Sequence, residues 1–376
     1  MIPPSPSGPF SVYIHLPFCL RKCPYCSFFS LPLKEDGREK YIPLLEGEMA
    51  AWKDKLTGGW ADTVYFGGGT PSLLTLNQWE SLFNSLEVSV PLGPAPEITV
   101  EANPESLSRE HLSLWRERGV TRVSLGVQSF SDAELLWLQR PHDGRRAEEA
   151  LALIGEEGLS SSADLMFGLG GQTLRSWKYS LSRALSLGAE HLSLYQLTLE
   201  KGSRWYSRPP EGRPDGYPFY RFAQWLLPRK GLSQYEVASF SLPGRQSRHN
   251  SAYWTNKPVL ALGAGAWGYW GEKRYRNEDT LKGYEQAVQK NGTACKEWLE
   301  LSAEESAREA AVLYLRTAEG IPFDEFTLRY GIEILDEIRS VLKEQVPGSC
   351  LEWRRESVAL TPRGMRVGNS IWSMLI

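Results

Sequence analysis

The feature that most constrains this fold is a regular alternation of short β-branched segments with longer amphipathic segments through the first two thirds of the 376-residue chain. The short segments have the length and composition of buried strands. The expected strands are Val12–Leu16, Thr63–Gly67, Glu97–Ala102, Arg122–Gln128, Ser162–Phe167 and His191–Thr198. Repeated strand-then-helix units predict a parallel sheet with right-handed crossovers. Because a complete barrel of this kind needs about eight units, the pattern predicts an α/β fold with a partial (β/α)6 barrel, open along one side.

The segments between these strands show helical periodicity. The expected helices are Arg38–Leu56, Leu76–Leu86, Arg109–Arg118, Arg145–Gly155 and Leu174–Leu187. Gly119, Gly158 and Gly188 stand where three of the helices should end, since glycine favours the left-handed conformation of a helix C-cap. Ser108 and Ser131 are expected N-caps.

The pattern changes near residue 300. Further along the chain, helices are expected at Ser302–Thr317, Phe323–Tyr330 and Glu333–Lys343, followed by a β-ribbon within Cys350–Leu360 and a last helix that starts at Pro362. Helices with a small ribbon resemble a winged-helix module. We therefore expect a barrel domain with an extension over residues 1–300 and a small helical, winged-helix-like domain over residues 301–376.

Composition excludes several classes of protein. Lys+Arg 42 against Asp+Glu 45 gives a net charge of −3, so nucleic acid is not an expected partner. The uncharged stretch before Arg21 contains several prolines and has no basic start, so it is not expected to be an export signal. No other uncharged run is long enough for a membrane span. These features predict a cytoplasmic globular protein.

The strongest chemical signal is the cysteine spacing C-x3-C-x2-C directly after the first expected strand. Cys19, Cys23 and Cys26 lie within eight residues, whereas Cys295 and Cys350 stand alone. Three thiolates on one loop can hold three corners of a cubic iron–sulfur cluster and leave the fourth iron without a protein ligand. Structural zinc is the alternative; it requires four ligands, and His15 could supply the fourth.

Three glycines end the second expected strand, in the sequence Thr-Val-Tyr-Phe-Gly-Gly-Gly-Thr-Pro at 63–71. Residues without a Cβ allow a ligand to approach the backbone closely, although a tight turn alone also explains them. This segment and the cysteine loop should lie at the same carboxyl edge of the sheet, where parallel folds bind ligands.

Together these motifs resemble the radical S-adenosylmethionine (SAM) superfamily. More narrowly, the chain is similar to the family of oxygen-independent coproporphyrinogen III dehydrogenases and related heme chaperones. The matching segments are 13–19 (Tyr-Ile-His-Leu-Pro-Phe-Cys), 101–104 (Glu-Ala-Asn-Pro), 124–130 (Ser-Leu-Gly-Val-Gln-Ser-Phe), 138–142 (Leu-Gln-Arg-Pro-His), 164–169 (Asp-Leu-Met-Phe-Gly-Leu), 249–254 (His-Asn-Ser-Ala-Tyr-Trp) and 360–364 (Leu-Thr-Pro-Arg-Gly). These matches run in order through almost the whole chain.

The resemblance implies a 4Fe–4S cluster on the three clustered cysteines, with SAM bound to the open iron. It also implies a set of cofactor-binding residues: Tyr13 beside the cluster, Gly68, Gly69 and Thr70 toward the methionine end, and Glu101, Gln128, Arg140 and Asp164 as polar contacts. A cationic sulfonium with a carboxylate calls for both acidic and basic side chains in one pocket. Taken singly, Arg140 could instead pair with Asp143, and Glu101 could cap a helix.

Two features separate the branches of this family. The dehydrogenases usually carry a fourth cysteine two residues after the third, and here that position is Phe28. Heme chaperones lack it and carry a His-Asn-x-x-Tyr-Trp motif, which is complete at 249–254. His249 is a candidate axial heme ligand, since a neutral imidazole ligates heme iron; a loop histidine bonded to backbone is the alternative.

The sequence therefore predicts a heme chaperone with heme as its cargo. Its expected partners are heme-accepting proteins, such as respiratory, membrane-associated ones, and an electron donor such as a flavodoxin or ferredoxin. The alternative is a radical SAM enzyme that decarboxylates a porphyrinogen or modifies heme, so whether the protein is an enzyme stays open. A zinc-stabilised barrel of unrelated function is a third hypothesis.

Overall fold

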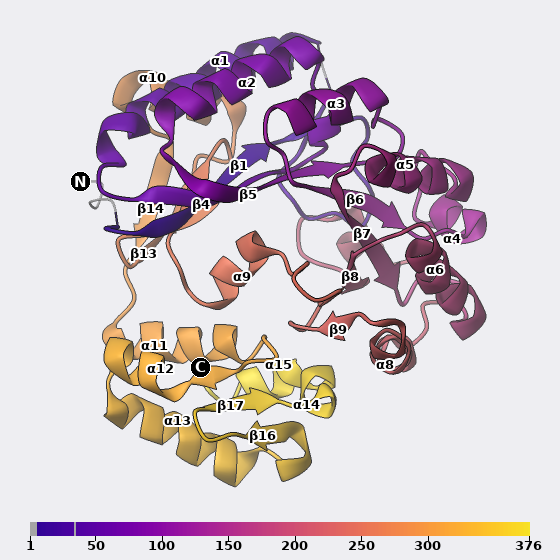
Figure 1. The fold of residues 1–376 in the computed structure, drawn as a ribbon, viewed down its shortest axis with the longest axis vertical. Helices are drawn as coiled ribbons and strands as arrows, with labels where there is room; N and C mark the ends of the chain where they lie inside the picture. The colour runs from indigo at the N-terminus through magenta and orange to yellow at the C-terminus, as the bar shows by residue number, and fades with distance from the viewer. Residues whose placement is uncertain (1–5, 34) are drawn as a thin grey trace. The chain divides into compact units, whose positions relative to one another are not determined.

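The structure is a computed structural model that describes residues 6–33 and 35–376. The chain packs into two compact units (Figure 1). Unit 1 holds the described residues up to Gly216 together with Pro258–Leu299, and unit 2 holds Tyr217–Lys257 and Glu300–Ile376. Unit 1 thus ends next to the division expected at residue 300. Tyr217–Lys257, which we expected in the first domain, packs within unit 2.

Parallel strands form the centre of unit 1. The strands are β1 (Pro9–Leu16), β4 (Trp60–Gly68), β5 (Leu92–Ala102), β6 (Arg122–Gln128), β7 (Ser160–Phe167) and β8 (His191–Gln196). Each pairs in parallel with the next in this order. The six expected strands are therefore present, and the fold is the predicted partial barrel.

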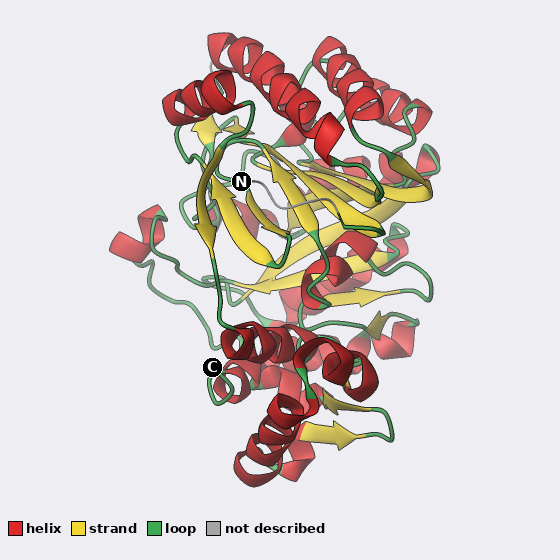
Figure 2. Cartoon of the chain, turned by 90° about the vertical axis from the view of Figure 1, so that its left-hand side faces the viewer, coloured by secondary structure: helices red, strands yellow, loops and turns green. Residues whose placement is uncertain are grey.

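Helices connect these strands and cover the outer side of the curved sheet (Figures 1 and 2). They are α1 (Glu35–Trp52), α2 (Leu76–Ser89), α3 (Arg109–Glu117), α4 (Asp132–Trp137), α5 (Gly144–Glu156) and α6 (Leu174–Ser186). Gly119, Gly158 and Gly188 have φ angles of +82°, +73° and +85°, as their expected C-cap positions require. Ser108 caps α3 by accepting a hydrogen bond from the backbone N–H of His111, whereas Ser131 stands at the N-cap of α4 without such a bond.

The sheet extends beyond β1 through strands that the sequence pattern did not predict. The strand β11 (Val259–Leu262) pairs in parallel with β1, and β12 (Trp267–Trp270), β13 (Lys273–Asn277) and β14 (Cys295–Leu299) continue the sheet in antiparallel order. The helix α10 (Leu281–Asn291) joins the last two. These strands are only four or five residues long, and glycines lie between β11 and β12 and within β12, so the strands lack the length that a sequence pattern needs to indicate them.

The core of unit 1 lies between the sheet and its helices. Trp79 of α2 contacts Phe66 of β4 and Trp115 of α3, with ring centroids 5.2 Å apart in each pair. Other fully buried tryptophans are Trp52, Trp177 and Trp270. Much of the large tryptophan content therefore stabilises the packing of helices on the sheet.

Unit 2 contains helices and a small three-stranded sheet. Its elements are α8 (Tyr217–Leu226), β9 (Ser233–Gln234), β10 (Ser239–Ser241), α9 (Arg248–Trp254), α11 (Ala303–Tyr314), β15 (Ile321–Pro322), α12 (Phe323–Tyr330), α13 (Ile332–Gln345), β16 (Leu351–Trp353), β17 (Ser357–Leu360), α14 (Pro362–Arg366) and α15 (Gly368–Trp372). β15, β17 and β16 form an antiparallel sheet against which the helices pack, as expected for a winged-helix-like domain. Across the described residues, no helix is both long and apolar enough to cross a bilayer.

Candidate functional site

The cysteine loop follows β1 at the carboxyl edge of the sheet. Its ends are tied by the short parallel strands β2 (Phe18–Cys19) and β3 (Leu31–Pro32). The backbone N–H of Cys26 donates to the carbonyl of Cys23 at 3.2 Å and makes a turn between these two cysteines. All three clustered cysteines are free and half-buried. Burial raises the pKa of the Cys19 and Cys26 thiols, so their thiolates require a compensating cation.

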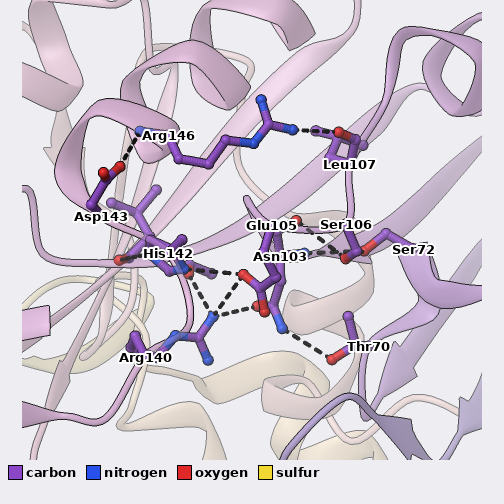
Figure 3. A network of polar contacts seen from close by, with 12 residues as sticks. Thr70, Ser72, Asn103, Glu105, Ser106, Leu107, Arg140, His142, Asp143 and Arg146 are labelled. Atoms are coloured by element: carbon purple, nitrogen blue, oxygen red, sulfur yellow. Dashed lines mark hydrogen bonds and ion pairs between the residues drawn. The ribbon is translucent and has the colours of Figure 1, made fainter. Parts of the chain in front are cut away.

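Arg140 links the cysteine loop to residues of the later strands and their loops through hydrogen bonds. Its guanidinium donates to the side-chain oxygen of Asn103 at 2.8 Å (Figure 3). It donates to the Sγ of Cys23 at 3.4 Å. It also donates to the carbonyl of Gly126 at 3.2 Å. Among the residues that the structure describes, none accepts a hydrogen bond from the buried Nε of Arg140. The alternative pairing with Asp143 is wrong, since Asp143 caps α5 by accepting from the backbone of Arg146.

Thr70 completes a polar chain between two of the cysteines. Its hydroxyl accepts from the Asn103 amide at 3.0 Å (Figure 3). The same hydroxyl contacts the Sγ of Cys19 at 3.8 Å. Since Asn103 also accepts from Arg140, the order Cys19–Thr70–Asn103–Arg140–Cys23 is continuous. Three predicted residue groups, which are far apart in sequence, therefore meet at one edge of the sheet.

Two half-buried carboxylates, Glu101 and Asp164, lie in the same unit. Glu101 accepts from the backbone N–H of Gly68 at 2.9 Å and from the hydroxyl of Tyr65 at 2.7 Å. It therefore binds a neighbouring strand, and the helix-cap alternative is wrong. Asp164 accepts from the hydroxyl of Ser124 at 3.2 Å. Burial, followed by repulsion from Glu101, raises the pKa of Asp164 to about 7, and burial also raises the pKa of Glu101.

Tyr13 and His15 form an aromatic group on β1. The hydroxyl of Tyr13 is 2.9 Å from Nδ1 of His15, and the ring of Tyr13 stacks on Tyr65 with centroids 6.1 Å apart. Nε2 of His15 is 3.0 Å from the carbonyl of Phe29, within the cysteine segment. Both ring nitrogens are thus engaged, and burial lowers the pKa of His15 to about 4. Across the described residues, no group of three or more His, Cys, Asp or Glu side chains is arranged so that it could hold a single metal ion.

Gly68 and Gly69 are required by close packing of the protein on itself. A Cβ at Gly68, where φ is +113°, would lie 2.4 Å from the ring of His15. A Cβ at Gly69 would lie 2.5 Å from the carbonyl oxygen of Phe18. The glycine run therefore allows the strand end to pass directly under the cysteine loop, which is a second reason for these glycines beside ligand access.

Gln128 ends β6 in an unusual conformation. Its φ angle is +63°, a left-handed value that few residues other than glycine adopt. A Cβ at Gly126 would lie 3.0 Å from the Nε2 atom of Gln128, so the side chain folds back along its own strand. Strained backbone of this kind is typical of binding sites.

His249 lies in unit 2, and the other predicted site residues all lie in unit 1. It is on α9, is buried, and contacts the ring of Tyr253 edge-on with centroids 5.4 Å apart. Burial lowers the pKa of His249 to about 3, which keeps the imidazole neutral. Trp254 of the same motif packs on the guanidinium of Arg316 at 4.4 Å, a structural contact within unit 2.

Several residues of the site were not predicted from the sequence. Asn103 joins Thr70 to Arg140, and Tyr65 binds Glu101. Glu105 and His142 form a buried pair beside Arg140 (Figure 3). Asn103 and His142 lie in the quoted segments 101–104 and 138–142. The sequence signal that could have identified Asn103 and His142 is that they are polar residues, without an assigned role, within the segments that match the family.

Comparison with known proteins places this chain in a family. Residues 13–184 match the radical SAM superfamily, and residues 301–367 match the HemN C-terminal domain. The chain is 34% identical to the heme chaperone HemW of Bacillus subtilis, in an alignment that covers 97% of this chain and 99% of the relative. It is 30% identical to HemW of Lactococcus lactis, with coverages of 98% and 97%. For HemW of Escherichia coli the identity is 38%, with coverages of 69% and 70%.

A solved structure shows the same fold. Coproporphyrinogen III oxidase (HemN) from Escherichia coli, a radical SAM enzyme, superposes with a TM-score of 0.86 over 98% of this chain and 90% of that chain, at 21% sequence identity. This confirms the predicted fold class. Because the similarity to the HemW relatives extends over the full length, the chain belongs to the HemW family of the radical SAM superfamily.

Proposed function

We propose that this protein binds heme and transfers it to acceptor proteins, and that it carries a 4Fe–4S cluster and SAM at the carboxyl edge of its sheet. The observation that carries the proposal is the full-length similarity to relatives described as heme chaperones, the first of which is 34% identical over 374 residues. The three-cysteine loop supports the same assignment.

The residues of the loop fit a cluster with one open iron. Cys19, Cys23 and Cys26 are the thiols that would hold it, and a cubic cluster has one more iron than these thiols can ligate. The position at which the dehydrogenases carry another cysteine is Phe28, whose side chain is 66% exposed. When bound, the cluster supplies an electron to the sulfonium of SAM.

The polar residues around the loop fit SAM. The buried Nε of Arg140 has no protein acceptor among the described residues, and a ligand carboxylate would satisfy it. Burial raises the pKa values of Glu101 and Asp164, and a cationic ligand would favour their ionised forms, which would then supply negative charge for the ammonium and sulfonium groups. Tyr13, Gly68, Gly69, Thr70 and Gln128 lie on the same edge and remain proposed contacts.

These residues also have roles of their own in the site. Arg140 places positive charge against Cys23 and holds Asn103, which in turn orients the hydroxyl of Thr70 toward Cys19. Glu101 fixes the backbone N–H of Gly68. The site is therefore braced before any cofactor binds, which reduces the entropic cost of binding.

His249 remains the proposed axial ligand of heme. Its neutral imidazole is the form that ligates iron. Since the side chain is buried, heme can reach it only if the residues packed over α9 move. The further partners that we propose are heme-accepting proteins and an electron donor of the flavodoxin or ferredoxin class. We also propose a cytoplasmic location, since a reducing compartment keeps cysteines free.

Heme titration followed by transfer tests this proposal. Anaerobically purified protein should retain heme with a shifted Soret band and should pass it to a heme-free acceptor. Failure of the wild-type protein to retain heme would contradict the chaperone assignment. A His249→Ala variant that keeps the Soret shift would exclude His249 as the ligand and leave the rest intact. Turnover of coproporphyrinogen III with SAM and a reductant would instead support the enzyme alternative.

A further inference from the structure

A largely buried pair of titratable residues lies beside Arg140 and has no role in the site described so far. The pair is Glu105, in the loop after β5, and His142, two residues after Arg140 (Figure 3). The side chain of His142 is fully buried, and the distance from its Nδ1 to the Glu105 carboxylate is 3.1 Å. The Glu105 side chain is 15% exposed, and a pair so largely shielded from solvent is costly unless its charges and hydrogen bonds are satisfied.

His142 lies between two hydrogen-bond acceptors. Nδ1 faces the Glu105 carboxylate, and Nε2 faces the backbone carbonyl of Val127 at 3.2 Å. Both neighbours are acceptors, whereas a neutral imidazole has only one N–H to donate. Only the imidazolium can donate to both. Burial alone would raise the pKa of Glu105, but the hydrogen bond from His142 and the charge of Arg140 hold it below its usual value.

The bond to Val127 acts on the strained turn at the end of β6. The Val127 carbonyl accepts from Nε2 of His142 and also from the backbone N–H of Ser129 at 2.8 Å. Gln128, between these two residues, has the left-handed φ of +63°. A non-glycine residue keeps such a conformation only when its surroundings enforce it. His142 therefore helps to hold the Gln128 turn.

The bond to Glu105 acts on Arg140. One guanidinium nitrogen of Arg140 is 3.9 Å from the Glu105 carboxylate, beyond hydrogen-bond length, while the same nitrogen donates to Asn103 at 2.8 Å. Because His142 satisfies Glu105, the carboxylate does not draw Arg140 away. The guanidinium N–H groups of Arg140 therefore stay directed at Asn103, Gly126 and Cys23.

We propose that His142 is held as an imidazolium cation between Glu105 and the Val127 carbonyl, and that this ion pair positions Arg140 and Gln128 for SAM. Glu105 and His142 are positioning residues, since the polar groups that they hold in place are the ones assigned to the cofactor. The inference rests on the proposed function, because it assumes that SAM binds at this edge.

The test compares variants of the anaerobically reconstituted full-length protein. Glu105→Gln keeps the shape and an acceptor oxygen but removes the charge, and His142→Gln removes one of the two donors. His111→Gln is the matched control. His111 of α3 also lies between a side chain and a carbonyl, Ser108 at 3.1 Å and Leu74 at 2.9 Å. Since the hydroxyl of Ser108 can donate or accept, neutral imidazole suffices there.

The readouts are SAM affinity, the change that SAM causes in the EPR spectrum of the reduced cluster, iron content and heme retention. We expect Glu105→Gln and His142→Gln each to weaken SAM binding on the order of tenfold, as outer residues of cofactor sites do. The double variant should lose no more SAM affinity than the more impaired of the two single variants, because both changes break the same Glu105–His142 pair. His111→Gln should bind SAM as the wild type does.

The outcomes separate this inference from the proposed function. Variants that fold, hold iron and bind SAM within twofold of the wild type overturn the positioning role alone. Losses that simply add in the double variant overturn the ion pair. If His142→Gln does not fold, Glu105→Gln decides in the same way. A wild-type protein that holds its cluster but binds no SAM overturns both the inference and the SAM part of the proposed function. A wild-type protein that binds SAM but retains no heme overturns only the heme part of the proposed function.

Discussion

Arg140 donates a hydrogen bond to the Sγ of Cys23, 117 positions earlier in the chain, at 3.4 Å. This contact joins the loop after α4 to the cysteine loop after β1. The guanidinium would compensate the charge of a Cys23 thiolate, and a hydrogen bond to a cluster-ligating sulfur would raise the reduction potential of a bound cluster. Arg140 is therefore the residue through which the later strands act on the cysteines.

Arg140→Lys should weaken SAM binding by about tenfold or more while the iron content stays near that of the wild type. Lysine keeps the charge, but a single ammonium cannot reproduce the separate bonds to Cys23, Asn103 and Gly126. Arg145→Lys, on a side chain that is 86% exposed, is the matched control. Isothermal titration with SAM measures the effect; equal affinities of both variants would contradict it.

SAM affinity should rise with pH between about 6 and 8. The pKa of Asp164 is raised to about 7 by burial and by Glu101, and a cationic ligand binds better to the ionised carboxylate. Asp164→Asn should flatten this dependence.

The stability of the protein without SAM should depend on pH in the opposite direction. The folded protein holds the Asp164 proton more tightly than the unfolded chain does, so this group lowers the free energy of unfolding as pH rises from about 4 to 7. Denaturation of the apoprotein at several pH values checks this direction.

Gly68→Ala should cost more stability than Gly58→Ala. Both glycines have positive φ angles, +113° and +94°, so both substitutions strain the backbone by about 1–2 kcal/mol. Only at Gly68 does the new Cβ also meet a neighbour, His15 at 2.4 Å, which adds about 1–3 kcal/mol. Chemical denaturation of the two variants measures the difference, and equal losses would show that the His15 contact does not matter.

Glu48→Ala should destabilise unit 1 by at least about 3 kcal/mol. The buried Glu48 carboxylate accepts from the backbone N–H groups of Gly263 and Ala294, and from the side chains of Asn277 and Tyr284. These donors tie α1 to the antiparallel extension, and removal of the carboxylate leaves them unsatisfied.

Glu39→Ala is the control for this variant, since it alters an exposed residue of the same helix and should change the free energy of unfolding by less than about 0.5 kcal/mol. If both variants unfold at the same denaturant concentration, the donors around Glu48 find other partners and the prediction is wrong.

The parts of the fold that could be predicted are those with a local signal. The strand Arg122–Gln128 has the same bounds in the sequence pattern and in the structure, because its apolar run is bounded by polar residues and a turn. Gly119, Gly158 and Gly188 mark helix ends because positive φ angles favour glycine. The cysteine loop could also be predicted, because the spacing of its three cysteines is by itself typical of an iron–sulfur site.

The rest depends on contacts that no local pattern encodes. β11 is four residues long, and its place beside β1 depends on pairing across most of the chain. Glu105 and His142 are 37 positions apart, and neither has a neighbour in sequence that signals an ion pair. The reasons for Gly68 and Gly69 are steric and involve the β1 strand and the cysteine loop. Tertiary packing therefore decided the details of the site.

The most direct test of the central claim is EPR spectroscopy of the anaerobically reduced protein, together with assays for iron and sulfide, before and after addition of SAM. We expect about four irons and four sulfides per chain and a cluster signal that changes with SAM. Replacing Cys19, Cys23 or Cys26 by alanine should abolish that signal. One zinc ion per chain with no sulfide, or a cluster whose signal ignores SAM, would contradict the central claim.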